Sequence, residues 1–107
     1  MERTILIYET ADGKRPFSDW LSKLKDRKAR AKVRARLNRV QLGNLGDCKS
    51  VGDGVSELRI NYGPGYRVYL GQRGATLLIL LCGGDKGTQQ KDIAKAKELW
   101  KEYKDAN

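Results

Sequence analysis

The stretch Glu57–Leu70, "ELRINYGPGYRVYL", holds two alternating segments on either side of a glycine–proline turn. Leu58 and Ile60 alternate with polar residues before the turn, and Tyr66 and Val68 alternate with polar residues after it. Alternation with a period of two is typical of strands with one buried face, and the Gly-Pro-Gly sequence is typical of a turn. The stretch therefore predicts an antiparallel hairpin, and its register decides which side chains share a face.

One register keeps every apolar residue of the hairpin on the same face. It pairs Glu57 with Tyr69, Leu58 with Val68, Arg59 with Arg67 and Ile60 with Tyr66, and it leaves the five-residue loop "NYGPG". A slip by one residue would turn the apolar side chains to the opposite face, so the pattern specifies the register. We therefore expect the apolar residues to face inward. The outer face would then carry Glu57, Arg59, Arg67 and Tyr69 together.

Two guanidinium groups on one face repel each other unless an anion lies between them. The residues alone leave two interpretations open. Glu57 is one candidate anion, and it would make the arrangement purely structural. A phosphate is the other, because arginine binds phosphate through two parallel hydrogen bonds.

The charge of the chain is concentrated in one segment. The 107 residues carry a net charge of +9, and residues 25–39, "KDRKARAKVRARLNR", hold eight lysines and arginines and a single acid, Asp26. A local positive field of this kind predicts a polyanionic partner or an acidic protein surface, and a solvated helix face is the simpler alternative. The length predicts a single domain over residues 1–107.

Several classes of protein are disfavoured. The chain has no histidine, and Cys48 and Cys82 have neither metal-ligand nor disulfide spacing, so we expect no metal site and no cofactor. Cys82 ends an apolar run and is expected to be buried, whereas Cys48 is expected in a loop. The N-terminal residues do not resemble a signal peptide, and the longest apolar run, Ala75–Cys82, is too short to span a bilayer. These features predict a cytoplasmic protein.

The remaining sequence predicts an α+β fold of order β-α-α-β-β-β-α. The expected elements are a strand at 3–9, a helix starting at Pro16, a basic helix ending near Leu42, strands at 55–61, 66–72 and 75–82, and a helix at 89–104 with Thr88 as N-cap. The strand at 75–82 is apolar on both faces and is expected at the centre of the sheet, and the glycines after it are expected to leave the sheet.

The hairpin and the segment "LLILLCGGDKGTQQKDIAKAKEL" together carry a family resemblance. They resemble the C-terminal half of the RelE/ParE superfamily of bacterial toxins, and most of all the HigB-like "addiction module killer protein" group. The resemblance extends over nearly the whole chain. It implies a RelE-like fold, with a twisted antiparallel sheet, an N-terminal helical hairpin and a C-terminal helix.

The resemblance also implies a function. Relatives of the RelE and HigB kind are toxins of type II toxin–antitoxin systems, and they are metal-independent endoribonucleases that cut mRNA in the ribosomal A site and so inhibit translation. The implied partners are a cognate helix-turn-helix antitoxin (HigA-like), the ribosome and mRNA, with operator DNA bound only through the antitoxin complex. Two alternatives remain open: a ParE-like inhibitor of DNA gyrase and a non-enzymatic nucleic-acid-binding module.

Candidate site residues follow from the same resemblance. Arg67 matches the arginine of the family's Gly-Tyr-Arg strand and would stabilise the transition-state phosphate, which Arg59 would also reach. Lys86 would stabilise the leaving group, Tyr69 would stack on a base, and Asp85 would accept a proton. Some relatives place histidines or a tyrosine near the last helix, and this chain has no histidine, so the identities of base and acid stay open. The basic helix would bind RNA through Lys28, Arg30, Lys32, Arg34, Arg36 and Arg39.

Overall fold

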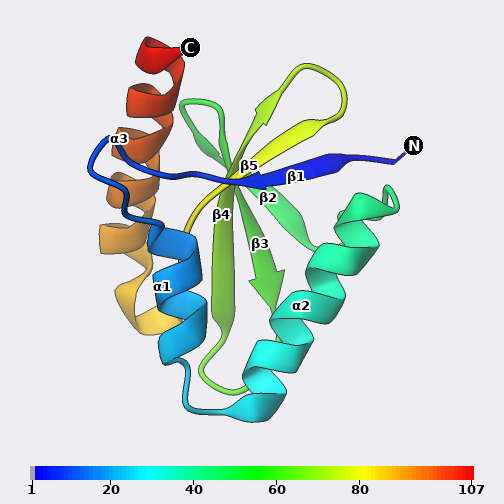
Figure 1. Ribbon diagram of the computed structural model, residues 1–107. Helices are drawn as coiled ribbons and strands as arrows, with labels where there is room; N and C mark the ends of the chain where they lie inside the picture. The colour runs from blue at the N-terminus through cyan, green and yellow to red at the C-terminus, as the bar shows by residue number, and fades with distance from the viewer. Residues whose placement is uncertain (1) are drawn as a thin grey trace.

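A computed structural model describes residues 2–107 as a five-stranded mixed sheet between two layers of helix (Figure 1). The strands are β1 (Thr4–Ile7), β2 (Cys48–Gly52), β3 (Val55–Ile60), β4 (Tyr66–Arg73) and β5 (Leu77–Asp85). Their order across the sheet is β1-β5-β4-β3-β2. β1 runs parallel to β5, and the other neighbours are antiparallel.

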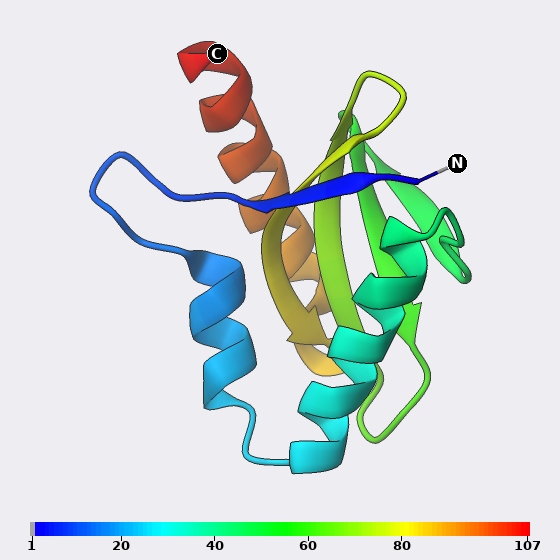
Figure 2. The same cartoon turned by 45° about the vertical axis from the view of Figure 1, so that its right-hand side comes forward.

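The helices cover both faces of this sheet. α1 (Pro16–Lys23) and α2 (Arg27–Gln41) pack on one face, and α3 (Gln89–Ala106), which follows the short 3-10 helix η1 (Lys86–Thr88), packs on the other. Figures 1 and 2 show α2 and α3 on opposite sides of the strands. Each helix buries one apolar stripe, as amphipathic spacing requires. The buried residues of these stripes include Phe17, Ala29, Val33, Val40, Ala96, Leu99 and Trp100.

The ends of α2 and α3 are set by local side chains. Asp26 caps α2, because its carboxylate accepts hydrogen bonds from the backbone N–H groups of Lys28 and Ala29 at 2.9 and 3.3 Å. Thr88 occupies the expected N-cap position of α3 but makes no side-chain cap bond to the backbone. Asp85 caps the preceding η1 turn instead, accepting from the N–H of Gly87 at 2.8 Å.

The predicted hairpin register is confirmed at every pair. β3 and β4 place Arg59 opposite Arg67, Glu57 opposite Tyr69, Leu58 opposite Val68 and Ile60 opposite Tyr66. The prediction of an outer face was wrong, however. Glu57 and Tyr69 are each 0% exposed, because α3 covers the face that they share. Both faces of the sheet therefore pack against helices. The polar residues on one face of the hairpin did not indicate that a helix covers that face too.

Three further expectations require correction. Cys48 does not lie in a loop: it begins β2, a short and largely polar edge strand that pairs with β3, so the order is β-α-α-β-β-β-β-α. The middle strand is β4, although β5 is buried on both faces as expected. β5 also continues through Gly83 and Gly84 to Asp85 and does not end before them. Among residues 2–107, no helix is both long and apolar enough to cross a membrane.

Two glycines of the sheet are required by tryptophans packed directly on the backbone. A Cβ added to Gly71 in β4 would lie 2.3 Å from the ring of Trp100, and one added to Gly83 in β5 would lie 2.2 Å from the ring of Trp20. These distances are far below van der Waals contact, so no side chain fits at either position without moving the indole. The glycines thus let each helical layer approach the sheet closely.

We expect Gly71→Ala to lower the free energy of unfolding by about 1–3 kcal/mol, because overpacking displaces the Trp100 ring. Urea unfolding followed by near-UV circular dichroism measures the loss. The neighbouring exposed Gln72 supplies the control, and Gln72→Ala is expected to change stability by less than about 0.5 kcal/mol. Equal stability of the two variants would contradict the packing described for Trp100.

Candidate active site

A buried carboxylate lies at the centre of the face that α3 covers. Glu57 Oε1 accepts a hydrogen bond from Arg59 Nε at 3.0 Å. Its Oε2 accepts from the Tyr69 hydroxyl at 3.0 Å and from Gln89 Nε2 at 2.9 Å. Arg67 Nε lies 3.7 Å from the same Oε2 atom, as an ion pair without a hydrogen bond. Glu57 therefore joins β3, β4 and the start of α3.

The anion between the two arginines is thus Glu57, the first of the two interpretations that the sequence left open. It contacts only the Nε side of each guanidinium group. Within residues 2–107, no hydrogen bond engages the terminal Nη groups of Arg59 or Arg67. The Arg59 side chain is 35% exposed and that of Arg67 is 11% exposed. Glu57 therefore contacts each arginine through Nε, and no acceptor among the described residues occupies their Nη donors.

The cluster stays ionic at neutral pH, because the pKa values of its members favour a charged Glu57. Burial alone would raise the pKa of Glu57, but hydrogen bonds from Arg59, Gln89 and Tyr69 together with the charge of Arg67 lower it below the ordinary value. Burial, reinforced by the hydrogen bond to Glu57, raises the pKa of Tyr69 far above that of a free phenol. Tyr69 therefore remains a neutral donor, and Glu57 remains a carboxylate at neutral pH.

Tyr69 is not available as a stacking platform, which corrects the sequence-based expectation. Its ring is fully buried beneath α3 among Val55, Ile79 and Leu99. A base would have to displace the helix to reach it. The tyrosine instead orients Glu57, a role that alternation within the hairpin did not reveal.

Lys86 and Asp85 lie at the end of β5 beside the hairpin. Asp85 is opposite Tyr66 in the β4–β5 ladder, and Gly84 is opposite Arg67. Lys86 is exposed, and a Cβ on Gly65 in the hairpin turn would lie only 3.6 Å from its Cβ. The structure therefore brings Lys86 and Asp85 to the same end of the sheet as Arg67.

Arg36 is not an RNA-binding side chain, contrary to the sequence-based expectation. It is 8% exposed, and its guanidinium group donates three hydrogen bonds to backbone carbonyls: Nε to Leu45 at 3.1 Å, Nη1 to Arg59 at 2.6 Å and Nη2 to Asp47 at 2.7 Å. The Asp47 carbonyl also accepts from the Arg59 N–H at 2.9 Å. Arg36 thus fixes the end of β3 at Arg59 from the opposite side of the sheet.

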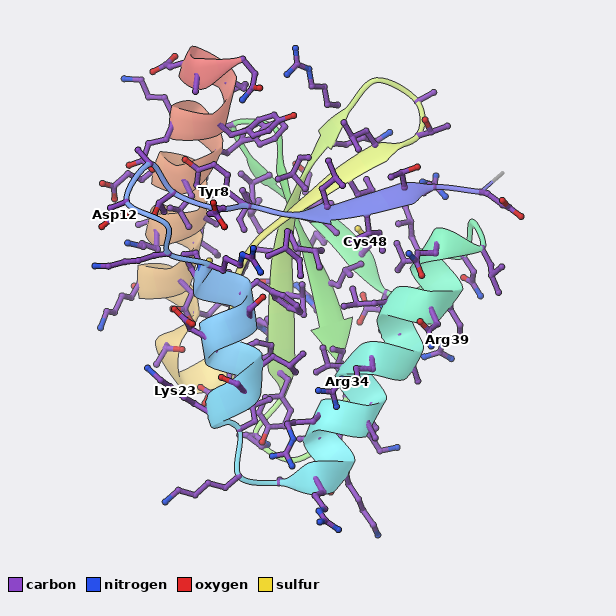
Figure 3. All side chains as sticks on the ribbon, in the orientation of Figure 1. Tyr8, Asp12, Lys23, Arg34, Arg39 and Cys48 are labelled. Atoms are coloured by element: carbon purple, nitrogen blue, oxygen red, sulfur yellow. The ribbon has the colours of Figure 1, made fainter. Side chains whose placement is uncertain are left out.

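The other cations predicted on α2 stay at the surface. Lys28, Lys32, Arg34 and Arg39 are exposed and Arg30 is partly buried, and Figure 3 shows Arg34 and Arg39 projecting from α2. The Lys32 ammonium lies 5.2 Å from the centre of the Tyr62 ring in the hairpin loop. The Tyr62 hydroxyl donates to Asp26 at 3.0 Å, which ties this loop to the start of α2. The basic surface and the arginine pair are therefore connected through one hairpin.

Two members of the site were missed by sequence reasoning. Gln89 reaches Glu57 only because α3 begins over the sheet, and nothing in "GTQQ" distinguishes it from its neighbour Gln90. Asp47 contributes a backbone carbonyl, which carries no side-chain signal. Among the described residues 2–107, no group of three or more His, Cys, Asp or Glu side chains is placed to hold a metal ion.

Comparison with known proteins identifies the family to which this chain belongs. Residues 19–101 match the family model described as "Phage derived protein Gp49-like (DUF891)". The chain therefore belongs to the Gp49-like family, which is associated with toxin–antitoxin systems and is related to RelE-like toxins. An uncharacterized protein of Haemophilus influenzae is 60% identical over 86 residues, which cover 80% of this chain and 87% of that protein. The relationship to RelE-like toxins expected from the hairpin is confirmed at this level, and the family implies a cognate antitoxin as partner.

We expect Glu57→Gln to lower the free energy of unfolding by roughly 3 kcal/mol or more at neutral pH, because it leaves the poorly exposed Arg67 without its counter-charge. The folded-state pKa of Glu57 is depressed. Its contribution is therefore fully present above the unfolded-state value of about 4.3 and is lost as the pH falls through the lower folded-state pKa. Chemical unfolding between pH 7 and 3 should consequently show a shallower acid loss in the variant.

The control for this titration is Glu98→Gln, which removes an exposed carboxylate from the outer surface of α3. It should retain the stability and acid profile of the unaltered chain to within about 0.5 kcal/mol. If Glu57→Gln behaved like this control, the buried ionic cluster would not be an element of the folded state.

We expect Arg36→Met to destabilise the chain by about 2–4 kcal/mol, because three carbonyl groups each lose one hydrogen bond. Arg39→Met removes a cation of the same type from the exposed surface of the same helix and should leave the thermal midpoint nearly unchanged. Thermal unfolding of both variants checks the distinction. Similar thermal midpoints of the two variants would show that Arg36 is a surface cation like Arg39.

Proposed function

We propose that this protein is a toxin that cleaves mRNA in the ribosomal A site, as HigB-like members of the RelE superfamily do. The observation that carries the proposal is the arginine pair. Glu57 lies 3.0 Å from Arg59 Nε and 3.7 Å from Arg67 Nε, and no hydrogen bond within residues 2–107 occupies the Nη donors of either arginine. Planar, pre-oriented guanidinium groups suit a phosphate whose charge increases in the transition state.

The proposed reaction transfers the scissile phosphate to the neighbouring 2′-hydroxyl of the message. The 2′ oxygen loses its proton to a base and forms a bond to phosphorus, while the bond to the 5′ oxygen breaks and that oxygen takes up a proton. The products are a 2′,3′-cyclic phosphate and a 5′-hydroxyl end. Arg67 and Arg59 would bind the non-bridging oxygens, and Lys86, exposed at the same end of the sheet, would stabilise the leaving oxygen.

Glu57 is unsuited to be the base. It is 0% exposed, and both of its oxygens already accept hydrogen bonds. Asp85 is the candidate proton acceptor at this end of the sheet: it is partly exposed, and the cap bond to Gly87 engages only Oδ1. Asp85 would act together with Lys86, the next residue along the chain, so that one carboxylate and one ammonium group serve the two proton transfers.

The exposed cations of α2 would bind ribosomal RNA. Lys28, Lys32, Arg34 and Arg39 supply charge without further acidic residues within the helix. Contacts of this kind are sequence-independent and weaken steeply with salt. A HigA-like helix-turn-helix antitoxin would be the partner that holds the toxin inactive. In this proposal the α2 surface positions the protein on the ribosome and the arginine pair acts on the message.

We expect Arg67→Lys to reduce A-site cleavage at least 100-fold, because a single ammonium group cannot reproduce the paired donors of guanidinium. Toeprinting in a translation extract measures cleavage. The matched control is Arg73→Lys, which makes the same change at the exposed end of the same strand and should cleave at nearly the original rate. Circular dichroism establishes that both variants are folded.

Two results would refute the assignment. Full cleavage by Arg67→Lys would show that the arginine pair takes no part in the cleavage reaction. Growth arrest with intact message and loss of DNA supercoiling would identify a gyrase inhibitor of the ParE kind in place of a nuclease.

A further inference from the structure

β1 forms an open edge of the sheet. It pairs only with β5, and it is the terminal strand in the sheet order. The backbone N–H groups of Thr4 and Tyr8 donate toward the β5 side, to Thr76 and Leu80 at 2.8 and 2.9 Å. Because alternate residues of a strand face opposite edges, the N–H and C=O groups of Ile5 and Ile7 face outward. β1 therefore presents main-chain donors and acceptors ready to pair with another strand.

Apolar side chains accompany this open edge. Leu6 and Ile7 are 48% and 44% exposed, and together with Leu42 they make up the large hydrophobic residues that the described part of the chain exposes. A groove of about 670 Å³ lies beside them, between the β1 region and the C-terminal half of α3. Its lining includes Leu6, Tyr8, Leu99, Glu102, Tyr103 and Ala106. Figure 3 shows Tyr8 beside α3, directly after β1.

The charge of the groove differs from that of the basic helix. Three carboxylate side chains and two lysines line it: Glu9, Asp12, Lys14, Lys95 and Glu102. Arg15 and Lys14 pair with the first two, whereas Glu102 accepts only the Tyr8 hydroxyl, at 3.3 Å, within the described residues. The mixed charges of this groove do not supply the concentrated positive field that attracts RNA. An open strand edge, exposed aliphatic side chains and a carboxylate without a cationic partner among the described residues suit a polypeptide instead.

We propose that the β1 edge and this groove bind an extended segment of the cognate antitoxin, which adds to the sheet as a sixth strand. Main-chain bonds to Ile5 and Ile7 would supply the pairing, apolar side chains of the segment would cover Leu6 and Ile7, and a lysine or arginine would meet Glu102. The inference rests on the antitoxin partner that the family implies, and it does not depend on the cleavage reaction.

The test uses the full chain and its purified cognate antitoxin. Amide hydrogen exchange should slow at residues 5–9 when the complex forms. Ile7→Pro removes the outward N–H without removing a ladder bond to β5, because proline is tolerated on edge strands. We expect it to weaken antitoxin binding at least 30-fold in isothermal titration. Glu102→Lys should weaken binding at least fivefold.

The matched control is Ile7→Val, which keeps both the N–H and a β-branched apolar side chain and should bind like the unaltered chain. Protection confined to α2 or to the arginine face, together with normal binding by Ile7→Pro, would overturn the proposal. Protection of residues 5–9 in the chain alone, rising with its concentration and accompanied by a dimer mass, would overturn it in favour of a second copy. Toeprinting with Ile7→Pro in the absence of antitoxin should show normal cleavage, so failure of this proposal is distinguishable from failure of the nuclease proposal.

Discussion

The arrangement of the candidate site depends on the ion cluster around Glu57. One carboxylate that water does not reach holds two guanidinium groups on neighbouring strands and accepts hydrogen bonds from Tyr69 and from Gln89 at the start of α3. A buried ionic cluster is a poor way to stabilise a core, because well-packed apolar residues often do as well or better. Its presence beneath α3 is therefore better explained by the positions it imposes on Arg59 and Arg67 than by stability.

The same cluster explains why the sequence predicted part of the site and not the rest. The hairpin register could be predicted because five apolar residues of Glu57–Leu70 share one face, and one slip would expose them all. The burial of Glu57 and Tyr69 could not be predicted, since it depends on α3, which begins twenty residues after Tyr69. β2 was missed for a related reason: "CKSVG" is short and polar, and only its pairing with β3 makes it a strand.

Arg36 shows the limit of reasoning from charge. Within "KARAKVRARLNR" it is indistinguishable from Arg34 or Arg39, yet its place on the stripe with Ala29, Val33 and Val40 puts it against the sheet. The helical period was the available signal, because Arg36 follows Val33 by three residues and precedes Val40 by four. Composition predicted the basic surface. The helical period would have predicted that Arg36 is buried and does not belong to that surface. The backbone carbonyls of Leu45, Asp47 and Arg59 then account for its burial without a counter-ion.

A strand added at β1 constrains how an antitoxin can inhibit this protein. β5 lies between β1 and β4, so a new edge strand would lie three strand spacings, roughly 15 Å, from the strand that carries Arg67. That distance exceeds the screening length of about 8 Å at physiological salt, so charge on the added strand would hardly affect the arginine pair. Inhibition from this edge would therefore be steric, through the bulk that the partner adds to a molecule whose longest dimension is only 35 Å. Under the proposed function, in which the protein enters a confined site on the ribosome, such bulk would inhibit it even with the arginine pair uncovered.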